Sequence, residues 1–236
     1  MKEDKIRRFT LITGASLGIG KALAAECASR GMNLFLVSLP GDGLDDFVTE
    51  LEQKHGISTK YLTLDLTRSE APQIVYDYAR NMGLNINCVF NNAGIGHTGN
   101  FHDMKREEVE EMINLNLRAL TSITLLFLKD MIQQNEGHIL NVGSLGAYTP
   151  IAFKSVYLAS KSYVYFFTAA LQQEYRHTNL KFSVLMPGAV ATSDHVKKRV
   201  KESGFFGRLS LLSPESVAKY TLDKMEKGKF TIMPGV

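Results

Sequence analysis

The feature that most restricts the fold is an alternation of short apolar runs with longer segments of helical period. This alternation is typical of a parallel sheet covered by helices on both faces. The apolar runs predict seven strands, at about 9–13, 33–37, 59–64, 88–90, 138–142, 182–186 and 230–233. The segments between them predict helices at 18–30, 44–55, 71–81, 106–134, 155–177 and 214–227. We therefore expect an α/β fold, with a doubly wound parallel sheet in a three-layer sandwich.

Two of the expected helices carry start signals. Ser213 stands before Pro214, and Ser69 precedes Pro72, so each serine is a candidate N-cap followed by a proline in the first turn. There is no linker, repeat or low-complexity run, and 236 residues fit one domain over 1–236. The irregular stretch 188–212 is longer than an ordinary connection, and we expect it to be a substrate loop or lid.

The composition argues against several classes of protein. Hydrophobic residues make up 44% and charged residues 22% of the chain, as in globular proteins. The net charge is only +3, and without a basic stripe this argues against nucleic-acid binding. The N-terminus lacks the apolar region of a signal peptide, and the run Ile123 to Leu128 is too short for a transmembrane segment. Cys27 and Cys88 lack metal-ligand spacing, so we expect a reduced, cytoplasmic protein without a bound metal.

A glycine-rich loop joins the first expected strand to the first expected helix. It reads Thr13-Gly14-Ala15-Ser16-Leu17-Gly18-Ile19-Gly20. Gly14 permits a tight turn, Gly18 permits close approach of a cofactor, and Gly20 lets the helix pack on the strand with its N–H groups toward a pyrophosphate. Taken alone, the loop could also be a strand-to-helix turn that binds nothing.

Four motifs in one order extend this pattern along the chain. They are TGxxxGxG at the first loop, Asn91-Asn92-Ala93-Gly94, Ser144 thirteen positions before the YxxxK of Tyr157 and Lys161, and Pro187-Gly188 with Thr192. Together they resemble the short-chain dehydrogenase/reductase family. The resemblance implies a Rossmann-type sheet and an NAD(P)(H)-dependent oxidoreductase that transfers a hydride between a nicotinamide and a carbonyl or secondary alcohol.

Tyr157 and Lys161 lie four residues apart, so on a helix they share one face. A neighbouring ammonium favours the phenolate and lowers the pKa of a tyrosine. In isolation the pair could equally be two exposed neighbours, Ser144 a turn serine, and Asn116 a polar residue that distorts its helix. The resemblance implies a catalytic set of Asn116, Ser144, Tyr157 and Lys161, with Tyr157 as the general acid and base.

The resemblance also implies a set of cofactor contacts. Asp65 would take the adenine amine, Asn91 would brace the sheet beneath the ribose, and Thr192 would contact the carboxamide or a phosphate. The full expected set is Gly14, Ser16, Leu17, Gly18, Ile19, Gly20, Ser38, Asp65, Leu66, Asn92, Ala93, Gly94, Tyr157, Lys161, Pro187, Gly188, Val190 and Thr192.

The preference between NAD(H) and NADP(H) is read at the end of the second strand, where an acidic residue takes the ribose hydroxyls. Ser38 stands there, followed by Leu39 and Pro40. The missing carboxylate, and a backbone at 41–43 that could accept a phosphate, favour NADP(H). The basic residues that often accompany NADP(H) are replaced by Leu17 and Leu39.

The substrate is expected to be an apolar, moderately bulky carbonyl compound. Candidate contacts are Ser144, Tyr148, His97 and Phe205, of which Phe205, with Phe206, could instead belong to a packing or partner surface. The run 197–199, Lys-Lys-Arg, is a solvated face or a contact for an acidic carrier. A 3-oxoacyl-carrier-protein-type reductase is one alternative, and a non-catalytic cofactor-binding regulator on the same fold is another.

The segment 155–177 is apolar around much of its helical circumference, more than packing on one sheet requires. Val156, Leu158, Tyr163, Phe166 and Phe167 lie on several of its sides. We therefore expect a homodimer or homotetramer that forms through the helices at 106–134 and 155–177.

Overall fold

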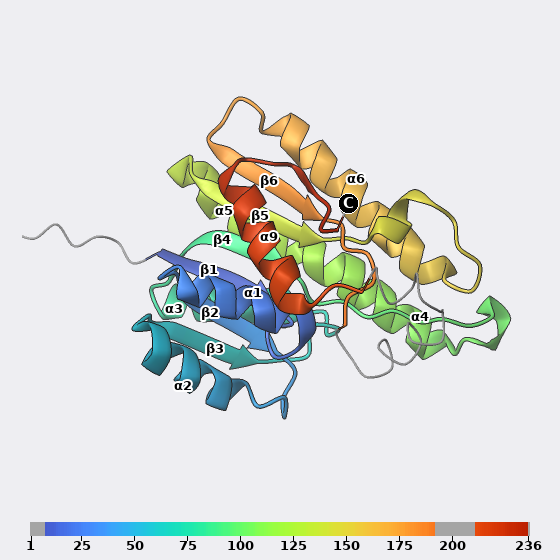
Figure 1. Ribbon diagram of the computed structural model, residues 1–236, viewed down its shortest axis with the longest axis horizontal. Helices are drawn as coiled ribbons and strands as arrows, with labels where there is room; N and C mark the ends of the chain where they lie inside the picture. The colour runs from blue at the N-terminus through green and yellow to red at the C-terminus, as the bar shows by residue number, and fades with distance from the viewer. Residues whose placement is uncertain (1–7, 192–210, 236) are drawn as a thin grey trace, which may run out of the picture.

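The computed structural model describes residues 8–191 and 211–235, which form one sheet between two layers of helices (Figure 1). All pairings in the sheet are parallel, in the order β3, β2, β1, β4, β5, β6, β7. The strands are β1 (Arg8–Thr13), β2 (Asn33–Ser38), β3 (Thr59–Thr63), β4 (Asn85–Asn91), β5 (Gly137–Val142), β6 (Leu180–Leu185) and β7 (Thr231–Ile232). The predicted α/β fold is confirmed.

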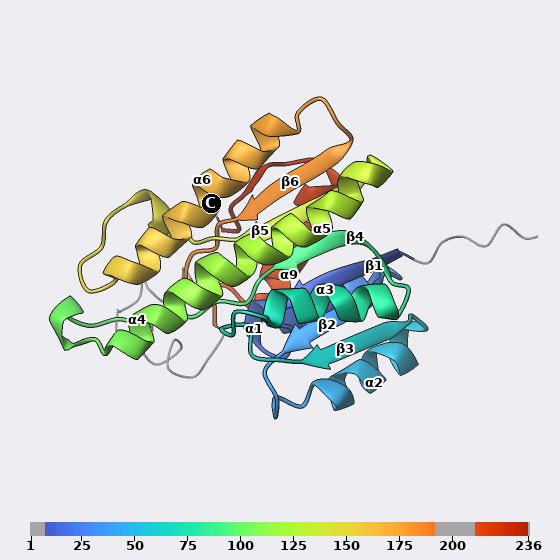
Figure 2. The same ribbon diagram turned by 180° about the vertical axis from the view of Figure 1, so that it is seen from behind.

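The helices divide between the two faces of the sheet, as the alternation in the sequence predicts (Figures 1 and 2). Helices α1 (Gly18–Ser29), α2 (Leu44–His55) and α9 (Pro214–Glu226) cover one face. Helices α3 (Ala71–Asn81), α5 (Leu120–Gln134) and α6 (Ser155–Glu174) cover the other. Neighbouring strand residues separate accordingly: Leu11 packs into the second core and Ile12 into the first.

The long helix expected at 106–134 is interrupted. It consists of α4 (Arg106–Ile113), a π-helical segment η2 (Asn114–Ala119) and α5. The hydrogen bond of a π-turn spans one more residue than that of an α-helix, and such turns are frequent at functional sites. The strands also differ at their ends, since β4 begins at Asn85 and β7 contains only Thr231–Ile232.

One of the two predicted helix caps is confirmed and the other is wrong. The Ser213 hydroxyl accepts a hydrogen bond from the Ser216 backbone N–H at 3.1 Å, which caps α9. The N-cap of α3 is Glu70, with no side-chain cap, and Ser69 lies one residue outside. A hydrogen bond from the Ala71 N–H to the Arg68 carbonyl, 3.2 Å, makes a turn just before α3. This turn moves the helix start by one residue.

Polar side chains join the centre of the sheet to the helices on one face. The Asn91 amide donates to the Asn141 amide oxygen at 2.8 Å and to the Thr124 hydroxyl of α5 at 2.9 Å. The Asn141 amide donates in turn to the Thr168 hydroxyl of α6 at 2.9 Å. All four residues are buried, and their hydrogen bonds tie β4 and β5 to α5 and α6. The Asn91 amide oxygen is buried without a hydrogen-bond partner among the described residues. Asn91 thus braces the sheet, and its expected place beneath the ribose stays a prediction.

The first and last helices are joined by a cluster of charges. Arg30, just after α1, pairs with Glu26 at 2.6 Å, with Asp223 at 2.7 Å and with Glu226 at 2.6 Å. Because one guanidinium pairs with three carboxylates, the conformational entropy of the Arg30 side chain is lost only once for three ion pairs. The cluster fixes α9 against α1 above the first core.

The predicted lid at 188–212 lies mostly outside the described residues, which omit 192–210. Its two described ends lie side by side, because Val190 and Leu212 form a parallel bridge. The Ala191 N–H donates to the Leu212 carbonyl and the Leu212 N–H to the Ala189 carbonyl, each at 3.0 Å.

His138 on β5 makes folding stability depend on pH. Its Nε2 lies 2.9 Å from the Ser183 hydroxyl oxygen, and that hydroxyl donates to the Lys229 carbonyl, so Nε2 carries the hydrogen. Burial, with a smaller effect of Lys181, lowers the His138 pKa from 6.5 to about 4. The unfolded chain then binds more protons between these values, and stability falls as the pH drops from about 6.5 to 4.

Between pH 7 and pH 5 the free energy of unfolding should decrease in the wild type and in His138→Gln. We expect the decrease to be about 2 kcal/mol smaller in His138→Gln, which lacks the buried imidazole. Urea titrations at the two pH values measure this difference. His102→Gln, in the exposed η1 (Phe101–Asp103), is the control and should keep the wild-type dependence. Equal pH dependence in His138→Gln and wild type would contradict the assignment.

Candidate active site

The cleft of this fold begins where β1 and β4 lie side by side and the chain turns outward in opposite directions, the usual ligand position in such sheets. The Asn92 amide donates to the Thr13 carbonyl at 2.9 Å and to the Gly14 carbonyl at 3.0 Å. The Thr13 hydroxyl accepts from the N–H groups of Asn92 at 3.1 Å and Ala93 at 3.0 Å. These contacts fix the glycine loop against the segment that follows β4.

The glycines of the loop are required by its shape. Gly14 and Gly18 have φ of +64° and +54°, values that favour glycine. A Cβ on Gly20 would lie 2.0 Å from the Gly14 carbonyl oxygen and 2.4 Å from Asn92 Nδ2. The loop therefore brings the N-terminus of α1 to the cleft, where its free N–H groups can bind phosphate. Gly20 acts in packing, since it does not line the cleft.

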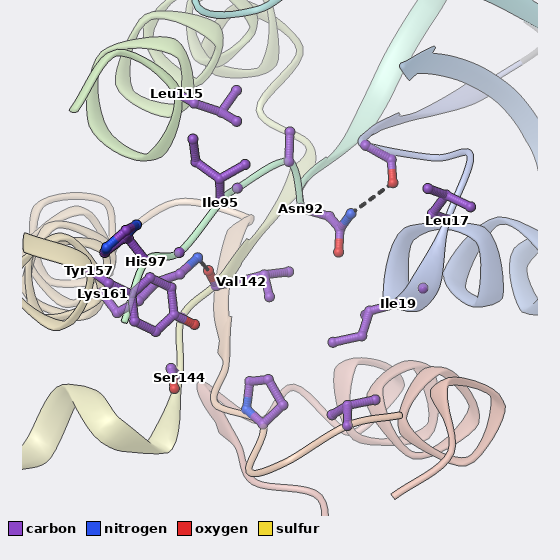
Figure 3. A pocket seen from close by; sticks show the side chains of 18 of the residues that line it. Leu17, Ile19, Asn92, Ile95, His97, Leu115, Val142, Ser144, Tyr157 and Lys161 are labelled. Carbon is purple, nitrogen blue, oxygen red and sulfur yellow. Dashed lines mark hydrogen bonds between the residues drawn. The ribbon is translucent and has the colours of Figure 1, made fainter. Parts of the chain in front are cut away.

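The cleft has a volume of about 1080 Å³ and extends from the glycine loop to the start of α6 (Figure 3). Leu17 and Ile19 lie at one end, and Ser144, Tyr157 and Lys161 gather at the other. Most of the predicted site residues line it, namely Gly14, Ser16, Leu17, Gly18, Ile19, Ser38, Asp65, Leu66, Asn92, Ala93, Gly94, His97, Ser144, Tyr157, Lys161, Pro187, Gly188 and Val190. Thr192 and Phe205 lie outside the described residues.

Ser144, Tyr157 and Lys161 come together from the end of β5 and the first turns of α6. The Lys161 ammonium donates to the Val142 carbonyl at 2.9 Å and lies 5.8 Å from the centre of the Tyr157 ring. Ser144 begins the turn η3 (Leu145–Tyr148), where its hydroxyl accepts from the Gly146 N–H at 3.3 Å. The i, i+4 prediction for Tyr157 and Lys161 thus places both on the face of α6 that borders the cleft.

Burial governs the titration of this pair. It raises the pKa of Tyr157, with a smaller opposite effect from the Ser144 hydroxyl, and it lowers the pKa of Lys161 to about 8. The sequence reasoning predicted that Lys161 would lower the Tyr157 pKa. The removal of the phenol from water outweighs any such effect.

Asn116 lies in the π-helical segment η2 behind the cleft and does not line it. Its amide oxygen accepts from the Ile95 N–H at 3.0 Å, and its nitrogen donates to the Ile95 carbonyl at 2.9 Å and the Ser160 hydroxyl at 3.0 Å. The Ser160 hydroxyl donates to the Tyr157 carbonyl at 2.6 Å. Asn116 therefore links the cleft wall at Ile95 to the helix turn that carries Tyr157.

Acidic and hydroxyl side chains surround the other end of the cleft. The Asp65 carboxylate accepts from the Thr67 N–H at 2.8 Å and the Thr67 hydroxyl at 2.7 Å. The Ser38 hydroxyl donates to the Leu39 carbonyl at 3.2 Å. The Ser16 hydroxyl donates to the Asp42 carboxylate at 2.9 Å. From the sequence, only the backbone at Asp42 was considered as a cofactor contact. The pattern that could have pointed to its side chain is an acidic residue between two glycines in the loop after β2.

The substrate end is apolar with a few polar groups. Ile95, Leu115, Ile151 and Leu158 line it, together with His97, Glu111 and Lys154. Sequence reasoning found His97 and missed the others, of which Glu111 and Leu115 lie four residues apart and face the same side.

Tyr148, predicted as a substrate residue, does not line the cleft formed by the described residues. Its ring packs edge-on against Tyr165 of α6, with ring centres 5.1 Å apart. This contact holds the side chain at the end of η3, away from the cleft.

The family model described as short chain dehydrogenase matches residues 8–203. The chain belongs to this family. It is similar to human 17-beta-hydroxysteroid dehydrogenase type 3, with 35% identity over 194 residues, which is 79% of this chain and 60% of the relative. It is also similar to a very-long-chain 3-oxoacyl-CoA reductase of Anas platyrhynchos, with 34% identity over 78% of this chain and 60% of the relative. The chain thus spans about 60% of the length of these relatives.

Solved structures share the fold. A short-chain dehydrogenase from Sphingobium yanoikuyae in complex with NADPH has a TM-score of 0.86 and 28% identity, over 97% of this chain and 88% of that one. An alcohol dehydrogenase from the archaeon Thermococcus sibiricus, complexed with 5-hydroxy-NADP, has a TM-score of 0.79 and 26% identity, over 96% and 95% of the two chains.

Within 8–191 and 211–235, no helix has the length and apolar character needed to cross a membrane. The same residues contain no group of three or more histidine, cysteine, aspartate or glutamate side chains that could hold a metal ion.

Gly96 gives the Tyr157 ring its space, because a Cβ there would lie 2.9 Å from Tyr157 Cδ2. We expect Gly96→Ala to displace the phenol and lower the turnover number by about 100-fold, as a shift of about 1 Å can. Cofactor affinity should stay near the wild-type value. Steady-state kinetics and fluorescence titration of a reduced cofactor measure the two quantities.

A double variant separates this effect from general damage. If Gly96→Ala acts through the phenol, adding it to Tyr157→Phe should cause little further loss. Independent losses that multiply in the double variant would contradict the interpretation.

Proposed function

We propose that this chain is an NAD(P)(H)-dependent oxidoreductase that transfers a hydride between a nicotinamide and a carbonyl or secondary alcohol. The observation that carries the proposal is the position of Ser144, Tyr157 and Lys161 at one end of a cleft whose other end is the glycine loop. A reacting centre and a phosphate-binding loop thus share one continuous space. The whole activity is a proposal, since the chain covers only part of its relatives.

The cleft fits a dinucleotide. The crowding at Gly20 and the positive φ of Gly14 and Gly18 require glycine at these three positions, where no side chain covers the loop backbone. The N-terminus of α1 faces the place where a pyrophosphate would lie. When bound, the nicotinamide supplies or accepts the hydride, and the protein provides binding, orientation and the proton.

Tyr157 would give the proton to the substrate oxygen during reduction. Its raised pKa keeps the phenol protonated at neutral pH, as a general acid requires. The Ser144 hydroxyl would donate a hydrogen bond to the same oxygen and hold it within reach of the phenol. In the reverse direction Tyr157 would accept the proton of the alcohol.

Lys161 would stabilise the phenolate that remains after the proton has left. With a pKa of about 8, its ammonium is mostly charged at pH 7. Burial strengthens the attraction between this ammonium and a phenolate. The hydrogen bond to the Val142 carbonyl keeps the ammonium beneath the ring, and Asn116 would position the same turn of α6 through Ser160.

Two observations act in opposite directions on the preference for NADP(H) expected from Ser38. Solved relatives that hold NADPH or an NADP derivative support it. The Asp42 carboxylate beside Ser16 opposes it, because it would stand close to an added phosphate.

For the substrate, the apolar residues Ile95, Leu115 and Leu158 support an apolar carbonyl compound. Relatives named for a hydroxysteroid and for 3-oxoacyl-CoA agree with that class. A cytoplasmic location stays a prediction from the sequence.

Tyr157→Phe tests the central role. We expect it to lower the turnover number by about 100- to 10,000-fold, with cofactor affinity unchanged, in an assay of nicotinamide absorbance over a panel of apolar ketones. Tyr148→Phe makes the same chemical change outside the cleft and should keep wild-type turnover. Undiminished turnover in Tyr157→Phe would overturn the proposed role.

The chain is further proposed to form a homodimer or homotetramer through α5 and α6. Exposed positions on α6 form one apolar stripe of Ala159, Tyr163, Phe166 and Ala170, and Phe166 is 69% exposed. Leu125 of the neighbouring α5 is 55% exposed, and Thr121 and Tyr163 link the two helices by a hydrogen bond of 2.9 Å. An apolar face of this kind supports a contact with a second copy.

We expect the wild type to be at least dimeric by light scattering at micromolar concentration, and Phe166→Glu to be monomeric because it would bury a charge in the interface. Met82→Glu, at the exposed end of α3, is the matched control and should keep the assembly. A wild-type monomer would contradict the proposal.

A further inference from the structure

The loop after β2 brings a carboxylate back to the phosphate loop. Gly41 and Gly43 have φ of +87° and +64°, so Asp42 stands between two left-handed residues. This conformation reverses the chain and directs the Asp42 side chain toward Ser16, whose hydroxyl donates to Asp42 Oδ2 at 2.9 Å. Asp42, Ser16 and Ser38 all line the same end of the cleft.

The charge at this end of the cleft is negative. Asp42 and Asp65 line it, and Asp45 and Asp46 lie close by in the first turn of α2. Among the described lining residues, the only lysines are Lys154 and Lys161, at the α6 end. The ammonium of Lys21, in the first turns of α1, lies 4.8 Å from the centre of the Phe47 ring and does not line the cleft.

A 2′-hydroxyl and a 2′-phosphate on the adenosine ribose would interact differently with Asp42 at this end of the cleft. The hydroxyls of the adenosine ribose can donate to a carboxylate, which accepts without a proton of its own. A phosphate would bring further negative charge beside Asp42, and like charges at short distance repel. The two lysines of the described cleft lining, Lys154 and Lys161, lie at the opposite end. Leu17 and Leu39 add no hydrogen-bond donors from their side chains.

We propose that Asp42 is the specificity-determining residue for the cofactor and makes the chain prefer NAD(H) over NADP(H). It supplies, four residues further along the chain, the carboxylate that Ser38 lacks at the end of β2. Its Oδ2 aligns with the Ser16 hydroxyl, and its Oδ1, without a hydrogen-bond partner among the described residues, is placed to accept from the ribose. The inference rests on the proposed function, since it concerns the cofactor of that same site.

The test is a fluorescence titration of the full chain with NADH and with NADPH, which needs no substrate. We expect the wild type to bind NADH at least about tenfold more tightly, a difference of about 1.4 kcal/mol. Asp42→Asn keeps an oxygen that can accept from Ser16 and removes the charge. It should lower the NADPH dissociation constant and reduce the preference for NADH by about tenfold.

Two controls make the result specific to Asp42. Asp46→Asn removes the same charge from an exposed position that does not line the cleft, and it should leave the preference within about twofold of the wild type. Raising the salt concentration should narrow the wild-type preference, since salt screens repulsion at an exposed site, and should affect Asp42→Asn much less.

The outcomes separate this inference from the proposed function. Tighter binding of NADPH by the wild type, or an unchanged ratio in Asp42→Asn, would overturn the role of Asp42 and leave the oxidoreductase standing. Failure to bind either cofactor would overturn both.

Discussion

The hydrogen bonds between Asn92 and the Thr13-Gly14 turn are the constraint on which the cleft depends. They join the ends of β1 and β4, from which the chain leads away in opposite directions. The distance between the two segments that form the cleft walls is therefore fixed by these hydrogen bonds. The same contact between Asn92 and Gly14 leaves no room for a side chain at position 20. The glycine loop, the wall after β4 and the start of α1 are therefore placed together by a single amide.

The reacting end of the cleft is held by a different device. Asn116 bonds both the N–H and the C=O of Ile95, as a neighbouring strand would, and its remaining amide hydrogen reaches Ser160. In a regular α-helix the direction of each side chain is set by its position in the turn. The π-helical turn η2 changes that direction for the residues it contains. From the sequence, Asn116 was either a member of the catalytic set or a polar residue that distorts its helix. The structure shows a distorted helix at Asn116 together with hydrogen bonds to the cleft wall and to α6.

Much of the fold and most of the cleft lining could be predicted because both follow from local patterns. Apolar periodicity predicted the seven strands, and motif spacing predicted Tyr157 and Lys161 on one face of a helix. What failed depended on contacts between distant residues. Tyr148 is held away from the cleft by Tyr165, and the charge state of Tyr157 follows from burial, which no i, i+4 rule contains. Asp42 acts through the reversal of a loop, which spacing alone does not indicate.

The cluster of Arg30 with Glu26, Asp223 and Glu226 has a consequence for the order of events during synthesis. Helix α1 leaves the ribosome well before α9, the helix that packs on it. The apolar side of α1 that packs on α9 is exposed to solvent while almost two hundred intervening residues are synthesised. The apolar face of α1 therefore stays uncovered in the nascent chain until α9 has been made, and the ion cluster then joins the two helices.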